Sequence, residues 1–446
     1  MIDAIPMLGH KIDGFLARAW HRLSPPREER GVASLELRAA VEASAPLLER
    51  ILMENIVSFW HPRCLDERCG GYLVGHDSRG GYKGNSNKRL IIQARVMWFF
   101  ARLARSGRMV DEALAAARHG FEFLHKMWDA QHGGFYWESD PCGERPTVSH
   151  KYVLAQTFPI FALSEYAVVA KDAAALRLAS RTFEVLDRQL RDPVHGGYWN
   201  RLTADWQSGD LPPTVTRSPN GLKTTEIHLH VLEAMTPYLE ATKDGLARQR
   251  LVELLHIQTV RVYRSQWGAC SDAHRPDWVP LLDPEHAWVN YGHDLENIGV
   301  VIAACAANGM PPDTYLDFYR ALFRTALRWG FDRRRGGFFR SGPLGQPAYD
   351  RTKYHWVQAE ALGAAMEMFS LTGEAQYARC YLRTLDWIVD HHVDWQHGEW
   401  HDRPVRRGQP PDDKTGPWKD PFHHGRALLR SLELIGELRS AEQGQV

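Results

Sequence analysis

A glycine pair followed by an aromatic residue recurs along the chain at an almost constant interval. The copies, four strong and one weaker, are Gly70-Gly71-Tyr72, Gly133-Gly134-Phe135, Gly196-Gly197-Tyr198, Gly336-Gly337-Phe338 and Gly398-Glu399-Trp400. They are 63, 63, 140 and 61 residues apart, so the long interval has room for one further unit, and Trp267-Gly268 stands where that unit should begin. Self-similarity at a fixed period is typical of repeat folds, and we count six units.

Helix-length segments lie between these turns. Lys88–Arg105 contains strong helix formers, and its apolar residues recur at helical spacing. The same pattern predicts helices over Val110–Trp128, Gln156–Ala170, Ala173–Leu190, Glu226–Thr242, Leu246–Tyr263, Leu295–Ala307, Pro312–Trp329, Trp356–Leu371, Glu374–His391 and His423–Leu438. Two helices and a short β-hairpin turn in each unit predict an all-α fold, an (α/α)6 barrel of six helical hairpins, because an open stack would expose the apolar faces of its end units. An open helical solenoid is the alternative.

The chain divides into a short extension and one large domain. Ser24–Arg30 is rich in proline and charge, so we predict an N-terminal helical extension over residues 1–35 and a single barrel domain over residues 36–440. Thr203–Lys223 and Pro404–Trp418 are long irregular segments, and loops of that length are often lids or binding loops.

Composition and charge exclude several classes of function. The 54 basic and 54 acidic residues give no net charge, so no long-range field gathers nucleic acid or anionic lipid. No stretch approaches 18 consecutive apolar residues, which excludes a membrane span, and His10 and Lys11 interrupt the first apolar segment. The six cysteines show no zinc spacing, although Cys64 and Cys69 could bridge. We expect a reduced, cytoplasmic protein, a monomer or a homodimer.

Two histidines stand at the starts of predicted inner helices, where a barrel of this shape has its funnel. His293 and Glu296 share a helix face, which suits a general base whose basicity a carboxylate tunes. The alternative is a helix cap at Asp294 beside an incidental histidine. His423 could face the funnel while His424 points away, or the two could form an exposed pair.

Other polar residues fall on apolar helices. Arg95 must face a polar cavity, pair with a carboxylate or lie at the rim of the bundle, because an unpaired buried guanidinium costs several kcal/mol. Glu226, His230 and Glu233 line one helix face, whereas His228 is rotated by about 200° from His230. We therefore predict no metal site.

Two tryptophans and the absence of several motifs further limit the substrates and reactions that the sequence can support. Trp356 and Trp418 can stack on sugar rings, with core packing as the alternative. The sequence has no GxGxxG in a βαβ unit, P-loop, HExxH or GxSxG, so we expect no cofactor. A glycosidase with paired carboxylates remains open, because acids on the predicted inner helices could supply the pair, namely Glu226, Glu233, Glu296 and Glu360.

Seven segments in this order resemble the N-acylglucosamine 2-epimerase superfamily, which includes cellobiose 2-epimerases and mannose or sulfoquinovose aldose–ketose isomerases. The resemblance runs from about residue 47 to residue 438 and rests on Q-A-R-V-M-W (93–98), F-P-I-F-A-L-S-E-Y (158–166), H-L-H-V-L-E-A (228–234), G-H-D-L-E (292–296), W-V-Q-A-E-A (356–361), G-E-W (398–400) and W-K-D-P-F-H (418–423). The family fold is the (α/α)6 barrel.

The resemblance implies proton transfer at C2 of an open-chain sugar. The family's two histidines match His293 and His423, one removing the C2 proton to give a cis-enediolate and the other protonating the opposite face. Arg95 matches the arginine that stabilises the developing oxyanion. His230 matches the residue assigned to ring opening, and Glu296 the carboxylate partner of His293. Trp356 and Trp418 match sugar-stacking tryptophans, and Glu226, Tyr152 and Glu360 are expected to contact substrate.

Two departures from cellobiose epimerases fall on substrate-contacting positions. Glu226 replaces an asparagine, and Leu154 replaces a tyrosine, with Tyr152 nearby in another register. G-H-D-L-E and P-F-H nevertheless resemble the epimerase branch. We therefore predict C2 epimerisation of a free, non-phosphorylated aldose or reducing-end sugar of mannose/glucose, cellobiose or N-acetylglucosamine type. The alternatives are aldose–ketose isomerisation, glycoside hydrolysis and a non-catalytic sugar-binding barrel.

Overall fold

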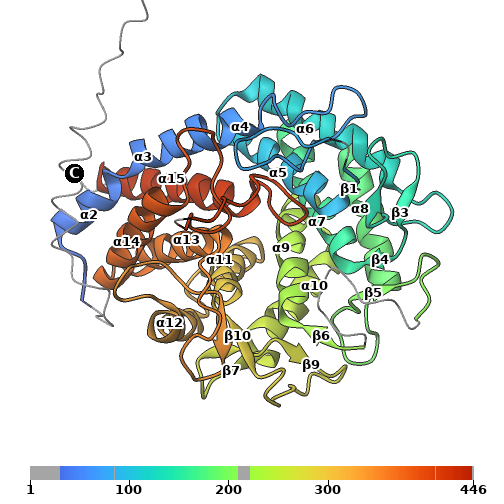
Figure 1. The fold of residues 1–446 in the computed structure, drawn as a ribbon. Coiled ribbons are helices and arrows are strands. Elements are labelled where there is room, and N and C mark those ends of the chain that lie inside the picture. Colours follow the sequence, from blue (N-terminus) through green and yellow to red (C-terminus); the bar gives the residue numbers. More distant parts are fainter. Residues whose placement is uncertain (1–30, 85, 209–220, 407, 444–446) are drawn as a thin grey trace, which may run out of the picture.

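Helices alternate between an inner and an outer ring in this computed structural model, which describes residues 31–84, 86–208, 221–406 and 408–443 (Figure 1). The inner helices are α5 (Leu90–Arg105), α7 (Val153–Ala170), α9 (Thr225–Thr242), α11 (Tyr291–Ala307), α13 (His355–Thr372) and α15 (Phe422–Gln443). Each packs against the next, and α15 contacts α5, so the ring closes on itself. The (α/α)6 barrel is confirmed, and the open solenoid is not observed within the described residues.

The outer ring covers the inner one. Its members are α2 (Leu35–Glu42), α3 (Ala45–Arg50), η1 (Ile51–Val57), α4 (Ser58–Trp60), α6 (Val110–Leu124), η2 (His125–Met127), α8 (Ala173–Gln189), α10 (Gly245–His256), η3 (Ile257–Arg261), α12 (Leu316–Thr325), η4 (Ala326–Gly330) and α14 (Ala375–His391). The first arm, from α2 to α4, was not among the predicted helices. It packs against α15 and so covers the junction between the first and last units.

Burial explains why the two rings differ in sequence. Inner helix α7 is apolar around most of its circumference, and by length and composition alone it could cross a membrane. In the barrel it is mostly buried, packed between α5 and α9. Outer helix α8 instead has a polar face and buries one apolar stripe, the pattern of a helix that covers a core.

Six tight turns join outer helices to inner helices at one end of the barrel. Five are closed by single antiparallel bridges, Leu65 with Tyr72, Trp128 with Phe135, Arg191 with Tyr198, Phe331 with Phe338 and Val393 with Trp400. The sixth is the hairpin of β7 (Tyr263–Arg264) and β8 (Ala269–Cys270). Trp267-Gly268 lies in this hairpin, so the position predicted for the missing unit is confirmed.

Five of these turns carry the same buried ion pair. An aspartate at the turn accepts a hydrogen bond from a lysine that precedes the next inner helix, in the pairs Asp66–Lys88 (2.6 Å), Asp129–Lys151 (2.8 Å), Asp192–Lys223 (2.7 Å), Asp332–Lys353 (2.9 Å) and Asp394–Lys414 (2.8 Å). The lysine ammonium and backbone N–H groups outweigh burial at Asp129 and lower its pKa to about 2. We call these five contacts the rim pairs.

A side chain of the inner helix also binds each of four turns. The amide oxygens of Gln93, Gln156 and Gln358 accept hydrogen bonds from the backbone N–H groups of Tyr72, Phe135 and Phe338. In the third unit His228 Nε2 accepts the same bond, from Tyr198 N at 2.9 Å. Gly134 shows why glycine is needed here, because its φ is +71° and an added Cβ would lie 2.6 Å from the Trp206 ring.

Short antiparallel strands connect neighbouring units around the same end. They are β1 (Lys88–Arg89) with β2 (Glu138–Ser139), β2 with β3 (Pro146–Val148), β4 (Lys151–Tyr152) with β5 (Arg201–Leu202), β6 (Lys223–Thr224) with β9 (Ala273–His274), and β10 (Trp288–Asn290) with β11 (Ser341–Pro343). Apart from β3, each pair joins the residues before one inner helix to the residues after the next turn. The first turns of the inner helices are thereby fixed in position.

Two further expectations bear on the ends and the cysteines. Of the predicted extension over residues 1–35, residues 1–30 lie outside the described residues, as do residues 209–220 of the Thr203–Lys223 segment.

The expectation of a fully reduced protein is wrong in the structure, where Cys69 forms a disulfide with Cys142 while Cys64 stays free and buried. Folding brings Cys142 from the adjacent unit to Cys69 across 73 residues, so local spacing could not reveal the pair.

Candidate functional site

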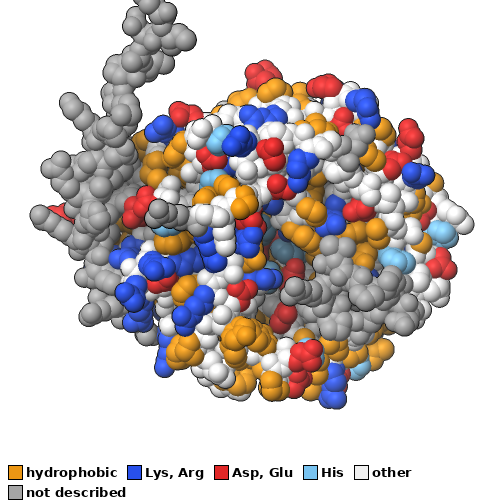
Figure 2. Space-filling model, viewed as in Figure 1, with side chains coloured by type: hydrophobic (Ala, Val, Ile, Leu, Met, Phe, Trp, Pro, Cys, Tyr) orange, Lys and Arg blue, Asp and Glu red, His pale blue; other side chains and the backbone are white. Residues whose placement is uncertain are grey.

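The first turns of the inner helices meet in a hollow at the centre of the barrel. Figure 2 shows this hollow on the face that carries the turns, with histidine and acidic side chains visible at depth. We call it the funnel. The helices that begin here carry their polar candidates in the first two turns, at Glu226 and His230 on α9, His293 on α11, Trp356 on α13 and His423 on α15.

Two histidines lie against one tryptophan, and a third lies beside one of them. The His293 ring centroid lies 5.0 Å from that of Trp356, and the His423 centroid lies 5.6 Å from the same indole. The His230 ring lies 6.4 Å from His293 and 5.2 Å from Phe158. Three predicted catalytic histidines and one predicted stacking tryptophan, contributed by four inner helices, therefore come together.

Carboxylates hold two of these imidazoles from behind. His423 Nδ1 shares a hydrogen bond with Glu360 Oε1 at 2.6 Å, and His230 Nδ1 shares one with Glu233 Oε2 at 3.0 Å. Such bonds fix the ring orientation and leave Nε2 of each ring for chemistry. Glu360, expected from the resemblance to contact substrate, is thus placed to position a histidine.

Arg426 joins the carboxylates to one another. Its Nη2 donates to Glu296 Oε1 at 2.5 Å and to Glu360 Oε1 at 2.7 Å, and its Nη1 donates to Glu233 Oε1. We call Arg426, Glu233, Glu296 and Glu360 the central cluster. It links the supports of His423 and His230 across the axis of the barrel, so neither histidine is positioned independently.

Arg95 lies beside these groups and, of the three alternatives considered for it, is paired with a carboxylate. Its guanidinium stacks over Phe158 at 4.2 Å and Phe422 at 4.7 Å, and its Nη1 is 3.7 Å from Asp420 Oδ2. The side chain is only 6% exposed, so water screens little of the interaction between its charge and the neighbouring groups.

Burial lowers the pKa of all three histidines. It lowers the pKa of His293 to about 4, where the Asp272 carboxylate opposes the shift and the Arg340 and Arg95 guanidiniums increase it. Burial and then Arg95 also lower the pKa values of His230 and His423 well below the usual range. At neutral pH the imidazoles are therefore uncharged and able to accept a proton.

Among the described residues, no hydrogen bond or ion pair joins Glu296 to His293. The i, i+3 spacing placed it beside His293, but its Oε1 binds Arg426 and lies 3.8 Å from His423 Nδ1. Burial raises its pKa to about 8, and nearby Glu226 adds to the shift while Arg95 opposes it. The carboxylate that acts on the charge of His293 is Asp272, in the segment between β8 and β9, which the sequence analysis did not single out.

The remaining candidates lie towards the rim of the funnel. Tyr152 is buried against Trp137, with centroids 4.5 Å apart, and Trp137 lies 5.9 Å from the 40% exposed Trp418. Glu226 is half-buried, and no hydrogen bond or ion pair joins it to another described residue. Its pKa is raised by burial, with Arg95 and Arg340 opposing.

Two groups in the centre have ligand atoms close enough for a metal ion, within 4.8 Å of one another, namely His230–Glu233–Glu296 and Glu296–Glu360–His423. The Arg426 guanidinium already binds the carboxylates of both groups, which makes a cation there redundant. His228 binds backbone groups through both ring nitrogens and does not join His230 in a site.

Sequence reasoning missed Arg426, Asp420, Asp272 and Arg340. Arg426 follows His423 by three residues on the same helix, a spacing that could have identified it. Asp272 and Arg340 come from the rim segments, and only the folding of the rim brings them towards the histidines.

Comparisons with known proteins agree with this geometry. Residues 71–427 match the model of the family described as N-acylglucosamine 2-epimerase (GlcNAc 2-epimerase). The chain is 25% identical to a cellobiose 2-epimerase of Bacteroides fragilis over 87% of this chain and 98% of that protein, and 25% identical to a D-mannose isomerase of Marinomonas mediterranea over 78% and 87%. The solved cellobiose 2-epimerase of Spirochaeta thermophila superposes with a TM-score of 0.81 at 27% identity, covering 91% of this chain and all of that one.

Proposed function

The chain belongs to the N-acylglucosamine 2-epimerase family of carbohydrate epimerases and isomerases, and we propose that it inverts C2 of a free aldose or reducing-end sugar through two histidines. In this proposal one of His293 and His423 removes the C2 proton and the other delivers a proton to the opposite face. The observation that carries the proposal is the approach of both imidazoles to a single indole, that of Trp356.

The difficult step is removal of the C2 proton, because a hydroxy-aldehyde C–H is a much weaker acid than an imidazolium. Stabilisation of the enediolate oxyanion must lower that barrier. Arg95 supplies a buried positive charge beside the histidines. The N-termini of the inner helices converge on the same funnel, and helix N-termini favour anions. A negative charge that develops on the sugar is thus favoured by two independent sources.

The reaction also needs one proton donor and one acceptor at the start. An ionised carboxylate accepts the Nδ1 hydrogen of His423 and leaves Nε2 free to accept a proton. A protonated carboxyl donates to Nδ1 instead, so that Nε2 carries the hydrogen and can donate it. Glu296, with its pKa near 8, keeps a proton in the central cluster at neutral pH. The protonation state of the cluster then selects the role of His423.

A retaining or inverting glycosidase would need two carboxyl groups that face the substrate. Three of the candidate acids, Glu233, Glu296 and Glu360, are instead bound to Arg426, and two of them also support histidines. Only Glu226 keeps an uncommitted carboxylate among the four acids considered for that role. This distribution favours proton transfer by histidine over glycoside hydrolysis.

The proposal is tested by incubating the protein with mannose, glucose, cellobiose and N-acetylglucosamine in D2O. We expect deuterium at C2 of at least one sugar, together with its C2 epimer, measured by NMR. Formation of a ketose would assign the aldose–ketose isomerase alternative. Absence of exchange with every sugar, in protein shown to be folded by circular dichroism, would contradict both reactions.

His293→Ala and His423→Ala should each lower kcat by about 10²- to 10⁴-fold, the usual contribution of a general acid or base. His256→Ala, an exposed histidine on outer helix α10, is the matched control and should keep wild-type turnover. Normal turnover in either catalytic variant would overturn the assignment of the two bases.

A further inference from the structure

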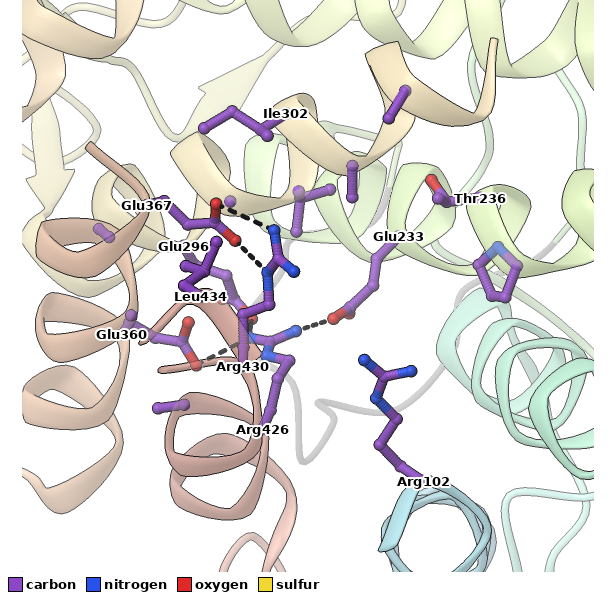
Figure 3. Close-up of a pocket in the computed structure, with 18 of the residues that line it drawn as sticks. Arg102, Glu233, Thr236, Glu296, Ile302, Glu360, Glu367, Arg426, Arg430 and Leu434 are labelled. Carbon is purple, nitrogen blue, oxygen red and sulfur yellow. Dashed lines mark hydrogen bonds and ion pairs between the residues drawn. The ribbon is translucent and has the colours of Figure 1, made fainter. Parts of the chain in front are cut away.

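A second cavity lies at the opposite end of the barrel from the funnel. Its volume is about 580 Å³, within the range of small-molecule sites. Every inner helix contributes to its wall, through Trp98, Phe161, Glu233, Leu295, Gly363 and Leu434 among others. Figure 3 shows acidic and basic side chains from facing helices converging on it.

The central cluster forms one wall of this cavity. Arg426, Glu233, Glu296 and Glu360 line it, and the same residues hold His423 and His230 from behind. A molecule in the cavity would therefore contact the groups that position two of the histidines, without entering the funnel.

Carboxyl groups outnumber guanidinium groups in the lining. The lining contains the seven glutamates Glu165, Glu233, Glu240, Glu296, Glu360, Glu367 and Glu437 and the four arginines Arg102, Arg105, Arg426 and Arg430. Each arginine already has a carboxylate partner, for example Arg102 with Glu433 at 2.6 Å and Arg430 with Glu367 at 2.7 Å. The positive charge of each arginine in the wall is thus already offset by a carboxylate.

Carboxylate oxygens, in contrast, remain available. Glu240 is exposed and has no hydrogen-bond or ion-pair partner among the described residues. The Glu296 side chain is fully buried, and its Oε2 has no hydrogen-bond partner there either. The inner helices also direct their C-termini to this end, where helix dipoles favour positive charge.

Apolar surface distinguishes an organic cation from a metal ion. Trp98 and Phe161 stack with centroids 5.2 Å apart, and both line the cavity together with Leu434. Aromatic and aliphatic walls beside carboxylates bind ammonium groups that carry hydrocarbon chains. The two central groups with metal-ligand spacing already bind the Arg426 guanidinium, and the third such group among the described residues, Asp283–Glu285–His286, does not line the cavity.

We propose that this cavity is a second binding site, for a small organic ammonium ion, and that its occupant alters catalysis through the central cluster. One ammonium group binds Glu240, and a second approaches Glu296 Oε2, where its charge favours the ionised carboxylate. The hydrocarbon part between them lies against Trp98 and Phe161. Binding competes with Arg426 for Glu296, which shifts the carboxylates that support the histidines. Only this effect on catalysis rests on the proposed function.

Two glycines provide a matched pair of variants. An added Cβ at Gly363 would lie in the cavity wall with its nearest neighbour, Ala427 Cβ, at 4.0 Å, whereas Gly436 on α15 lies outside the lining and has nothing within 4 Å. Gly363→Met fills the cavity and Gly436→Met does not. Both replace a helical glycine by a better helix former, so both should fold.

The experiment is calorimetric titration of the full-length protein with 1,4-diaminobutane, with pyrophosphate as the anionic comparison. We expect the diamine to bind wild type and Gly436→Met, and to bind Gly363→Met about tenfold more weakly or not at all. Glu240→Gln should weaken binding by about fivefold, the effect of one exposed charge pair. No binding of the diamine, preferential binding of pyrophosphate, or equal affinity in Gly363→Met would overturn the site.

The effect of the diamine on kcat is the second measurement, and it tests the coupling between the cavity and the histidines. Saturating diamine should change kcat of wild type and Gly436→Met by at least about twofold, and should leave Gly363→Met unaffected. Binding without any change in kcat would overturn the coupling. A failure of the proposed function is distinguishable, because it abolishes C2 exchange without diamine, whereas a failure of this inference leaves that exchange intact.

Discussion

The rim and the centre of the barrel handle buried charge in different ways. At the rim, each aspartate is neutralised by one lysine of its own unit, and the arrangement repeats in five turns. In the centre, one arginine is shared by Glu233, Glu296 and Glu360, and one carboxyl oxygen, Glu296 Oε2, has no hydrogen-bond partner among the described residues. Charges paired one to one hold the fold, whereas charges shared among helices adjust the protonation of neighbouring groups.

Breaking a rim pair should give the largest effect, a loss of stability without a loss of activity. Lys151→Met leaves Asp129 buried without its partner, and removing one member of a buried pair costs about 3–5 kcal/mol of unfolding free energy. Chemical denaturation should show this loss, while kcat of the folded fraction stays near wild type.

The matched control is Arg118→Met, which breaks the exposed pair Arg118–Glu122 and should cost less than about 1 kcal/mol. If Lys151→Met were no more destabilising than this control, the rim pairs would not hold the fold.

A substitution in the central cluster should instead lower activity while leaving stability almost unchanged. Glu360→Gln removes the carboxylate that accepts the hydrogen bond of His423 Nδ1, so kcat should fall by about 10- to 100-fold, measured by epimer formation. Unfolding free energy should change by less than about 1 kcal/mol, because the amide still accepts a hydrogen bond.

Glu374→Gln alters a buried carboxylate of comparable exposure that binds Arg320 at the outer ring, and should leave kcat unchanged. Equal kcat in Glu360→Gln and this control would mean that His423 is positioned without the central cluster.

The pH profile of kcat/KM should report the titration of two buried groups in the centre, His293 and Glu296. His293 has a pKa near 4 and Glu296 a pKa near 8. Protonation of His293 removes an acceptor as the pH falls, and loss of the proton from Glu296 adds a negative charge beside the enediolate as the pH rises. We expect activity to decline below about pH 4 and above about pH 8. An acidic limb near 6.5, the ordinary value for histidine, would contradict the role of burial.

The smallest effect should come from the edge of the funnel. Trp418→Ala removes a 40% exposed indole that has no ring contact with the three histidines, so KM should rise by a few-fold while kcat is maintained. Trp395→Ala, a similarly exposed tryptophan in the turn that Val393 and Trp400 close, is the control. A large loss of kcat in Trp418→Ala would place this residue at the reacting carbon.

Much of the fold could be predicted from the sequence because the repeat is local. Each Gly-Gly turn requires positive φ at fixed positions, and the interval between turns specifies two helices, so even the divergent turn at Trp267-Gly268 was located correctly. The first arm was missed. Pro46 and the π-helical turns of Ile51–Val57 interrupt the pattern of a single long helix there.

The candidate site was predictable only where a residue and its neighbours share a helix. His230 and Glu233 form the i, i+3 contact that their spacing allows, but His293 and Glu296, with the same spacing, do not. Arg426, from a different helix, binds Glu296 instead. Contacts across the axis of the barrel depend on six helices at once, and no local pattern records them.

The order of the helices along the chain has a consequence for biosynthesis. Helix α15 completes the ring, and it alone brings His423 and Arg426 to the centre. A nascent chain that has emerged only as far as α14 therefore contains His293, His230 and their surroundings but has neither the proposed second base nor the cation that joins the glutamates. Catalytic competence should arise abruptly once α15 has been synthesised, because only then can the ring close.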